Sequence, residues 1–285
     1  MMNILLIAID TLRADHLSCY GYNKKTSPNI DKEIAQEGII FENFFAPGIP
    51  THPGFTTIFT GLHPLRHKII CHAGKIILDR RIPTLPEILY KNNYTTAAID
   101  NLIMTGGLWF ARGFEYYINV TGTSKPMHHL VRGDQINRRL IQWLRNHKDE
   151  KFFILVHYWD PHTPYNQPEE FKRIFKHEPG KLDDLEVRVA PAGYQYVPGW
   201  GKVGELWEPK PEEGKPTIDL YDGEIRFVDS LIGEVSETLE ELDLADETVI
   251  VITSDHGEQL GQHGLYDHRG PVSYTHLTLP TTERV

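Results

Sequence analysis

Four short apolar segments, each followed within two residues by an aspartate, constrain the fold of this 285-residue chain more than any other feature. They are strand-sized and rich in Ile, Val, Phe or Thr, which is typical of buried strands. The segments are Asn3–Ile9, Thr95–Ile99, Phe152–Tyr158 and Thr248–Thr253. Helical patterns separate them, most clearly between Leu220 and Leu242, where apolar residues recur with the period of one helix face. This alternation predicts an α/β fold whose mostly parallel sheet is covered on both faces.

Polar residues end each of the four segments. They are Asp10, Asp100-Asn101, Asp160-Pro161-His162 and Ser254-Asp255-His256-Gly257. The carboxyl ends of parallel strands form the ligand-binding edge of an open sheet, so we expect these side chains to converge. A single aspartate in such a place is equally typical of a turn or a helix cap. Four endings of this kind, two of them with a histidine, favour a functional edge.

Three of these residues form a candidate metal site. Asp10 and Asp255 offer carboxylate oxygens and His256 offers an imidazole, a donor set that suits Mn, Zn or a similar divalent ion. Each residue alone is as consistent with a structural role as with a ligand role. The set as a whole predicts metal binding.

Thr51 is the candidate nucleophile. It stands just before an expected helix whose first turn carries Pro53. A hydroxyl there lies where the free N–H groups and the positive end of the helix favour an anion. Metal coordination would lower the pKa of that hydroxyl further. From this segment alone, however, a plain N-cap role for Thr51 or His52 is the better interpretation.

Composition excludes several classes of function. The formal net charge of −10 argues against broad electrostatic capture of nucleic acid, although a local basic pocket could still hold an anionic ester. No apolar run approaches the ~20 residues of a membrane span, and no signal peptide is evident, so we expect a cytoplasmic protein that does not bind membranes. The two cysteines, Cys19 and Cys71, form neither a disulfide framework nor a zinc-ligand pattern.

Two regions depart from the strand and helix alternation. Residues 166–216 combine many prolines and glycines with no sustained period, which predicts a long excursion over the active-site face. Residues 272–285 have neither a helical nor a strand period. We expect this tail not to be native sequence.

Together these motifs resemble the sulfatase family of the alkaline-phosphatase superfamily. The similarity runs in order from about residue 3 to about residue 270 and rests on residues 10–17 (DTLRADHL), 26–31 (TSPNID), 51–53 (THP) with 60–61 (TG), and 253–258 (TSDHGE). It implies an alkaline-phosphatase-like three-layer α/β/α sandwich over residues 1–271. The family continues with more strands and a smaller C-terminal region, so we expect the sheet to be incomplete at the C-terminus.

The resemblance also implies roles for individual residues. Asp10, Asp255 and His256 become metal ligands, and Thr51 becomes the covalent nucleophile that also touches the metal. One divalent ion is the simplest count, and Mn, Zn, Ca and Mg all stay open as its identity.

Four histidines match further positions of the family's active site. His162 corresponds to a histidine that contacts the transferred oxyanion or the leaving group, so His162 or His268 is expected to protonate the leaving alcohol. His72 stands where relatives often have an asparagine lining the pocket, His268 where many have a lysine, and His263 in the same loop. A second ion held by Asp160, His162 and His268 stays open.

The chain departs from the family pattern at the nucleophile. Sulfatases that mature a Cys or Ser to formylglycine carry Pro two residues later and Arg four residues later, whereas this chain has Thr51 and Phe55 at the first and last positions. A threonine ester lacks the second hydroxyl with which hydrated formylglycine expels sulfate. Its intermediate must therefore be hydrolysed at the central atom, which favours phosphate or phosphonate esters. Thr11 replaces a second Asp of calcium-dependent members and leaves fewer oxygens for calcium.

The sequence thus predicts a metal-dependent hydrolase of small anionic esters, sulfate or phosphate, and says nothing of oligomeric state. Two alternatives stay open. One is a phospho-transferase or mutase of the same superfamily, in which an alcohol replaces water as the acceptor. The other is an inactive, truncated metal-binding fragment.

Overall fold

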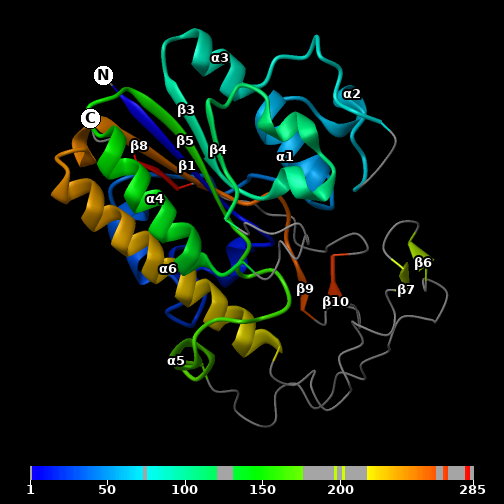
Figure 1. The fold of residues 1–285 in the computed structure, drawn as a ribbon. Helices are drawn as coiled ribbons and strands as arrows, with labels where there is room; N and C mark the ends of the chain where they lie inside the picture. Colours follow the sequence, from blue (N-terminus) through cyan, green and yellow to red (C-terminus); the bar gives the residue numbers. More distant parts are fainter. Residues whose placement is uncertain are drawn as a thin grey trace.

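A seven-stranded, mostly parallel sheet forms the centre of the computed structural model (Figure 1). The structure describes residues 2–72, 76–120, 131–175, 196–197, 201–202, 217–260, 266–268 and 280–282. The strand order is β2-β11-β8-β1-β5-β3-β4, and the five strands from β8 to β4 are parallel. The strands are β1 (Asn3–Ile9), β2 (Ile39–Ile40), β3 (Thr95–Ile99), β4 (Tyr116–Ile118), β5 (Phe152–Tyr158), β8 (Thr248–Thr253) and β11 (Pro280–Thr282).

The four strands expected from the sequence are confirmed with the bounds given above. Two separate antiparallel pairs also form, β6 (Tyr196–Val197) with β7 (Gly201–Lys202) and β9 (Gln259–Leu260) with β10 (Tyr266–Asp267). The α-helices are α1 (Thr51–Thr60), α2 (Pro64–His67), α3 (Leu85–Lys91), α4 (Gly133–His147), α5 (Glu169–Lys172) and α6 (Thr217–Glu241). Shorter turns of helix are 3₁₀ at Ala14–His16, Ser18–Tyr20, Leu102–Thr105, Leu108–Ala111 and Ala245–Glu247, and π at Ile30–Ala35.

Helices cover both faces of the sheet, with α4 and α6 side by side on one face and α1 on the other (Figure 1). The ring of Phe152 lies edge-on to Trp143 of α4, at 5.4 Å between centroids. The ring of the next residue, Phe153, stacks at 6.0 Å on Phe114, which contacts Phe59 of α1 at 5.9 Å. Successive side chains of a strand point to opposite faces. These contacts confirm the α/β/α layering.

Helix α6 buries the apolar face that its sequence predicts. Its buried apolar side chains include Ile225, Val228, Leu231, Ile232, Val235 and Leu239. Burying each such side chain contributes roughly 1.5–3 kcal/mol, which outweighs the modest helix propensity of the β-branched residues. No helix in the described part of the chain has the length and apolarity needed to cross a bilayer.

The register of the sheet brings three strand ends together. Ala8 of β1 pairs with His157 of β5 on one side and with Thr253 of β8 on the other. The residues that follow these three strands therefore leave the sheet side by side at one edge, as the sequence predicts.

The excursion and the tail lie largely outside the described residues. Within the excursion the structure describes residues 166–175, β6 and β7. Within the tail it describes only β11, which pairs antiparallel with β8 and β2. The sequence did not predict this strand, because three residues are too few to show a period of two.

Candidate active site

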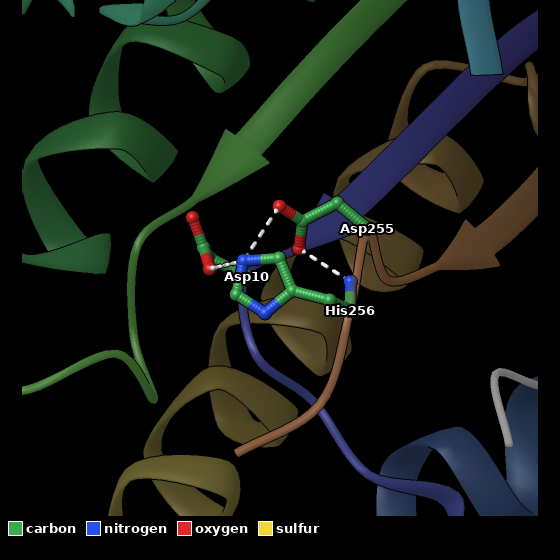
Figure 2. A group of neighbouring side chains, drawn as sticks. All are labelled: Asp10, Asp255 and His256. Atoms are coloured by element: carbon green, nitrogen blue, oxygen red, sulfur yellow. Dashed lines mark hydrogen bonds and ion pairs between the residues drawn. The ribbon is translucent and has the colours of Figure 1, made fainter. Parts of the chain in front are cut away.

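Three buried residues meet at the carboxyl-terminal edge of the sheet (Figure 2). Asp10 follows β1, and Asp255 and His256 follow the neighbouring strand β8. One ligand atom from each residue lies within 4.8 Å of the other two. His256 Nε2 is 3.3 Å from Asp255 Oδ2 and 3.8 Å from Asp10 Oδ1. The structure thus brings together the three side chains that the sequence predicts as metal ligands.

Local hydrogen bonds orient these side chains. His256 Nδ1 lies 3.0 Å from the Gly257 carbonyl oxygen, which can only accept, so Nδ1 donates, and in the neutral imidazole Nε2 then presents its lone pair to the carboxylates. Asp255 Oδ1 accepts from the backbone N–H of His256 at 2.9 Å, which leaves Oδ2 facing His256 Nε2. Electron-pair donors that face one another repel unless a cation lies between them. A donated Nδ1 and a bare Nε2 are the usual arrangement of a metal-bound histidine.

Several oxygens at this edge are buried without a hydrogen-bond partner among the described residues. They are Asp10 Oδ1, Asp10 Oδ2, Asp255 Oδ2 and Thr11 Oγ1. An unpaired buried oxygen costs about 1–3 kcal/mol, and more when it is charged. Thr11 also has φ = 56°, a left-handed conformation that is rare for a β-branched residue and typical of functional sites. The donor set fits a divalent cation.

The pKa values of the two carboxyl groups shift in opposite directions. Burial would raise the pKa of Asp10, but the imidazoles of His157, His162 and His256 outweigh burial and hold this pKa well below 3.8. Burial and the charge of Asp10 raise the pKa of Asp255 above 3.8. The charge of Asp10 therefore disfavours ionised Asp255 until a cation neutralises the pair.

Thr51 is the first residue of α1 and is buried beside His256. Its Oγ1 lies 3.4 Å from His256 Nε2. The helix approaches the site closely at Gly54, where an added Cβ would lie 2.6 Å from the Asp255 carbonyl oxygen and 2.9 Å from its Cβ. Glycine is therefore required for α1 to bring its N-terminus, with its free N–H groups, to this edge.

His162 and His268 lie beside the three candidate ligands. The ring centroid of His268 is 4.7 Å from that of His256 and 4.9 Å from that of His162. His162 Nδ1 donates to the Thr163 carbonyl, and His268 Nδ1 lies 3.4 Å from a carboxylate oxygen of the buried Glu258. Both imidazoles are thereby oriented at the edge where their sequence positions predict them.

His72 lies at the same edge, packed against His52 at 4.4 Å between ring centroids. Thr105 Oγ1 donates to the Leu102 carbonyl at 2.6 Å and accepts from His52 Nε2 at 2.5 Å. Burial lowers the pKa of His52 to about 4 and that of His72 to about 2. Both imidazoles are therefore neutral at pH 7 and add no positive charge to the site.

Asp160, His162 and His268 do not form a second metal-binding group among the described residues. The Asp160 carboxyl lies instead near Gly133 at the start of α4 and pairs with Glu224 of α6. Burial raises the pKa of Asp160 to about 6, and burial together with the charge of Asp160 raises that of Glu224 to about 9. Asp160 Oδ2 and Glu224 Oε2 are both buried without a hydrogen-bond partner among the described residues. His263 lies outside the described residues.

The sequence analysis missed a fully buried imidazole, His157, behind Asp10. His157 Nε2 is 3.5 Å from Asp10 Oδ2, and His157 Nδ1 is 2.7 Å from Asp100 Oδ1. Burial would lower the pKa of His157, but the two carboxylates outweigh it and raise this pKa to about 9. The signal was present: His157 is a single imidazole in a strand that is otherwise apolar or aromatic and buried at every position.

Comparison with known proteins identifies the family. The family model "Sulfatase" matches residues 2–278. The chain belongs to the sulfatase family. This confirms the resemblance found in the sequence, and the match extends a few residues into the segment expected to be non-native.

Sulfatase-family relatives cover nearly all of this chain but are longer than it. Human iduronate 2-sulfatase is 27% identical over 316 aligned residues, which include 92% of this chain and 56% of that enzyme. The chain thus spans little more than half the length of that relative.

Solved structures share the fold. The phosphonate monoester hydrolase of Agrobacterium radiobacter has a TM-score of 0.77 at 22% identity and covers 99% of this chain and 68% of its own. The C-terminal periplasmic domain of the phosphoethanolamine transferase EptC of Campylobacter jejuni has a TM-score of 0.64 at 18% identity, over 98% of this chain and 78% of its own. At these identities the comparisons establish the alkaline-phosphatase-like fold alone.

Proposed function

We propose that this sulfatase-family chain is the catalytic part of a metal-dependent ester hydrolase in which Thr51 is the nucleophile. One observation carries the proposal: the Thr51 hydroxyl lies 3.4 Å from His256 Nε2, at the buried edge where Asp10, Asp255 and His256 converge. Membership of the family supports the same chemistry.

A single divalent cation fits the donor set of Asp10, Asp255, His256 and the Thr51 hydroxyl. Unpartnered buried oxygens and the bare Nε2 of His256 support this fit, and Mn, Zn, Ca and Mg all remain open as the ion. When bound, such an ion would stabilise negative charge and lower the pKa of a coordinated hydroxyl.

Different residues of the chain carry out the steps of the proposed reaction. Thr51 loses its hydroxyl proton to solvent and its Oγ attacks the phosphorus or sulfur in line, so a new bond to Oγ forms as the bond to the alcohol oxygen breaks. His162 or His268 donates a proton to that departing oxygen. The free N–H groups at the start of α1 stabilise charge on the non-bridging oxygens. Water then gives a proton back to that imidazole and attacks the central atom as its bond to Oγ breaks, which releases the anion and restores the Thr51 oxygen.

We expect phosphorus esters to be better substrates than sulfate esters. A threonine ester has no neighbouring hydroxyl to expel the anion by cleaving its carbon–oxygen bond, so water must attack the central atom. This route is available to a phospho-threonine. The shared fold of a phosphonate monoester hydrolase is compatible with this preference. Because the chain is also similar to iduronate 2-sulfatase, sulfate esters must be assayed beside the phosphorus esters.

A panel of aryl sulfate, phosphate, phosphodiester and phosphonate esters, each with Mn, Zn, Mg or Ca, tests the proposal. We expect metal-dependent turnover that is fastest on a phosphorus ester and is abolished in Thr51→Ala. Thr51→Ser, which keeps the hydroxyl, is the matched control and should retain turnover. A faster rate on sulfate would overturn the substrate preference. Equal turnover by Thr51→Ala would overturn the role of Thr51, and no turnover with any ester and metal would favour the inactive fragment.

A phosphoryl or substituted-phosphoryl transferase is the second candidate. The fold shared with the periplasmic domain of a phosphoethanolamine transferase favours it, because transfer differs from hydrolysis only in the acceptor that attacks the Thr51 ester. Product analysis with an added acceptor alcohol separates the two. A transferase would form the new ester in preference to the free anion.

A further inference from the structure

A row of polar side chains runs across four adjacent strands behind the candidate metal site. Asp10 follows β1, His157 lies in β5, Asp100 follows β3 and Tyr117 lies in β4, and these strands are neighbours in the sheet in this order. His157 Nδ1 is 2.7 Å from Asp100 Oδ1, and His157 Nε2 is 3.5 Å from Asp10 Oδ2. The row reaches the metal site through one carboxylate only, that of Asp10.

Hydrogen bonds fix the carboxylate of Asp100, toward the far end of the row. Asp100 accepts a hydrogen bond from the backbone N–H of Leu102 at 2.9 Å and another from the hydroxyl of Tyr117. Its remaining oxygen therefore has a fixed direction, toward His157. Asp100 is only 2% exposed, so water does not compete for these bonds.

Aromatic rings hold the imidazole of His157 in place. The ring of Phe55, from α1, lies 4.5 Å from it between centroids, and the ring of Trp159 lies 4.4 Å from it. His157 is fully buried. Because packing and the bond to Asp100 both restrict the ring, Nε2 stays directed at Asp10.

We infer that His157, anchored by Asp100, is a positioning residue that holds the Asp10 carboxylate in its metal-binding orientation. Asp10 Oδ2 faces His157 while Oδ1 faces His256 Nε2 at 3.8 Å. No side chain among the described residues hydrogen-bonds the Asp10 carboxylate, so its ion pairs with His157 and His256 are the contacts that orient it. The inference rests on the proposed function, because it assumes that a cation binds at this edge.

Removing an outer partner of this kind typically weakens metal binding by about 10- to 100-fold. We therefore expect His157→Phe, which keeps a ring of similar shape, to lower the affinity for Mn²⁺ or Zn²⁺ by about this factor. Asp100→Asn should lower it in the same direction. The double variant should lose less metal affinity than the product of the two separate fold-losses, because both substitutions break the same chain of contacts.

Isothermal titration of the metal-free protein with Mn²⁺ and with Zn²⁺ gives the affinity without any assay of activity. The matched control is Tyr158→Phe, at the residue that follows His157 in β5. It removes the 2.7 Å hydrogen bond from the Tyr158 hydroxyl to Asn137 and leaves the row intact. Urea unfolding of each metal-free variant shows whether it folds. Should His157→Phe not fold, Asp100→Asn alone carries the test.

The titrations distinguish a failure of the positioning role of His157 from a failure of the proposed function. Loss of affinity in His157→Phe or Asp100→Asn, with wild-type affinity in Tyr158→Phe, supports the positioning role. Wild-type affinity in the folded His157 and Asp100 variants, or an equal loss in Tyr158→Phe, overturns it and leaves the proposed function standing. Failure of the wild-type protein to bind Mn²⁺ and Zn²⁺, and also Mg²⁺ and Ca²⁺ in the same titration, overturns both.

Discussion

Asp255→Asn should stabilise the metal-free protein and remove its stabilisation by metal. The ligand oxygens of Asp10 and Asp255 lie within 4.8 Å of each other in a buried site. Two unit charges at that separation repel by about 3 kcal/mol at an effective dielectric constant of ~20. Asn is nearly isosteric with Asp and keeps an oxygen that accepts the backbone N–H of His256. Because Asn removes one of the two charges, we expect a gain of about 1–3 kcal/mol in the free energy of unfolding without metal.

The assay is urea unfolding at pH 7.5, followed by tryptophan fluorescence, in EDTA and then in excess Mn²⁺. A ligand at 100 times its Kd stabilises the folded state by about 2.7 kcal/mol. Wild type should gain this amount and Asp255→Asn should gain little, so the order of stability should reverse between the two conditions. Asp149→Asn makes the same chemical change at an exposed site and should stay within about 0.5 kcal/mol of wild type in both.

Two results would refute this reasoning. One is an Asp255→Asn protein that is less stable than wild type in EDTA, which would mean that the buried carboxylates do not repel each other. The other is an equal gain from Mn²⁺ in both proteins, which would mean that the ion binds elsewhere.

Substitutions at Gly54, Glu224 and His268 test three further features of the structure. Gly54→Ala should destabilise the protein by about 1–3 kcal/mol in urea unfolding, because the new Cβ would lie 2.6 Å from the Asp255 carbonyl oxygen; an unchanged midpoint would show that α1 can move away. Glu224 and Asp160 have folded pKa values of about 9 and about 6, above their usual values, so the stability they contribute below pH 4 is lost as pH rises through 6 and then 9. Glu224→Gln cannot ionise and should flatten this decline, so its free energy of unfolding at pH 9 should exceed that of wild type by more than about 1 kcal/mol. An equally steep dependence of stability on pH in this variant would exclude the pair as the source of the decline. His268→Gln should reduce kcat for alkyl esters by about 10²–10⁴ but much less for nitrophenyl esters, whose leaving group needs no proton; equal losses would exclude a general-acid role.

The four central strands and the convergence of Asp10, Asp255 and His256 could be predicted from the sequence. Continuous apolar runs indicate buried parallel strands, and the geometry of such a sheet gathers their carboxyl ends whatever their separation along the chain. The start of α1 was predicted to within one residue, because Pro53 and the residues around it favour a helix start there. These inferences depend on local pattern and on a general rule of topology.

Other features of the site needed the coordinates. The distance of His157 from Asp10 depends on which strand lies beside β1, and the apolar runs do not specify strand order. Asp160 illustrates the same limit, because the family resemblance left a second metal with His162 and His268 open while its carboxyl lies against Glu224 of α6. Strand β4 was missed because three residues, Tyr116–Ile118, are too few to show a period.

The most direct test of the account is anomalous X-ray scattering at the manganese edge from crystals grown with Mn²⁺. We predict one strong peak among Asp10, Asp255, His256 and the Thr51 hydroxyl, with ligand atoms at about 2.0–2.2 Å, as oxygen and nitrogen donors bind such ions. A crystal with Mn²⁺ present but no peak at this edge, or with its peak on other residues, would contradict the claim that these groups share one cation.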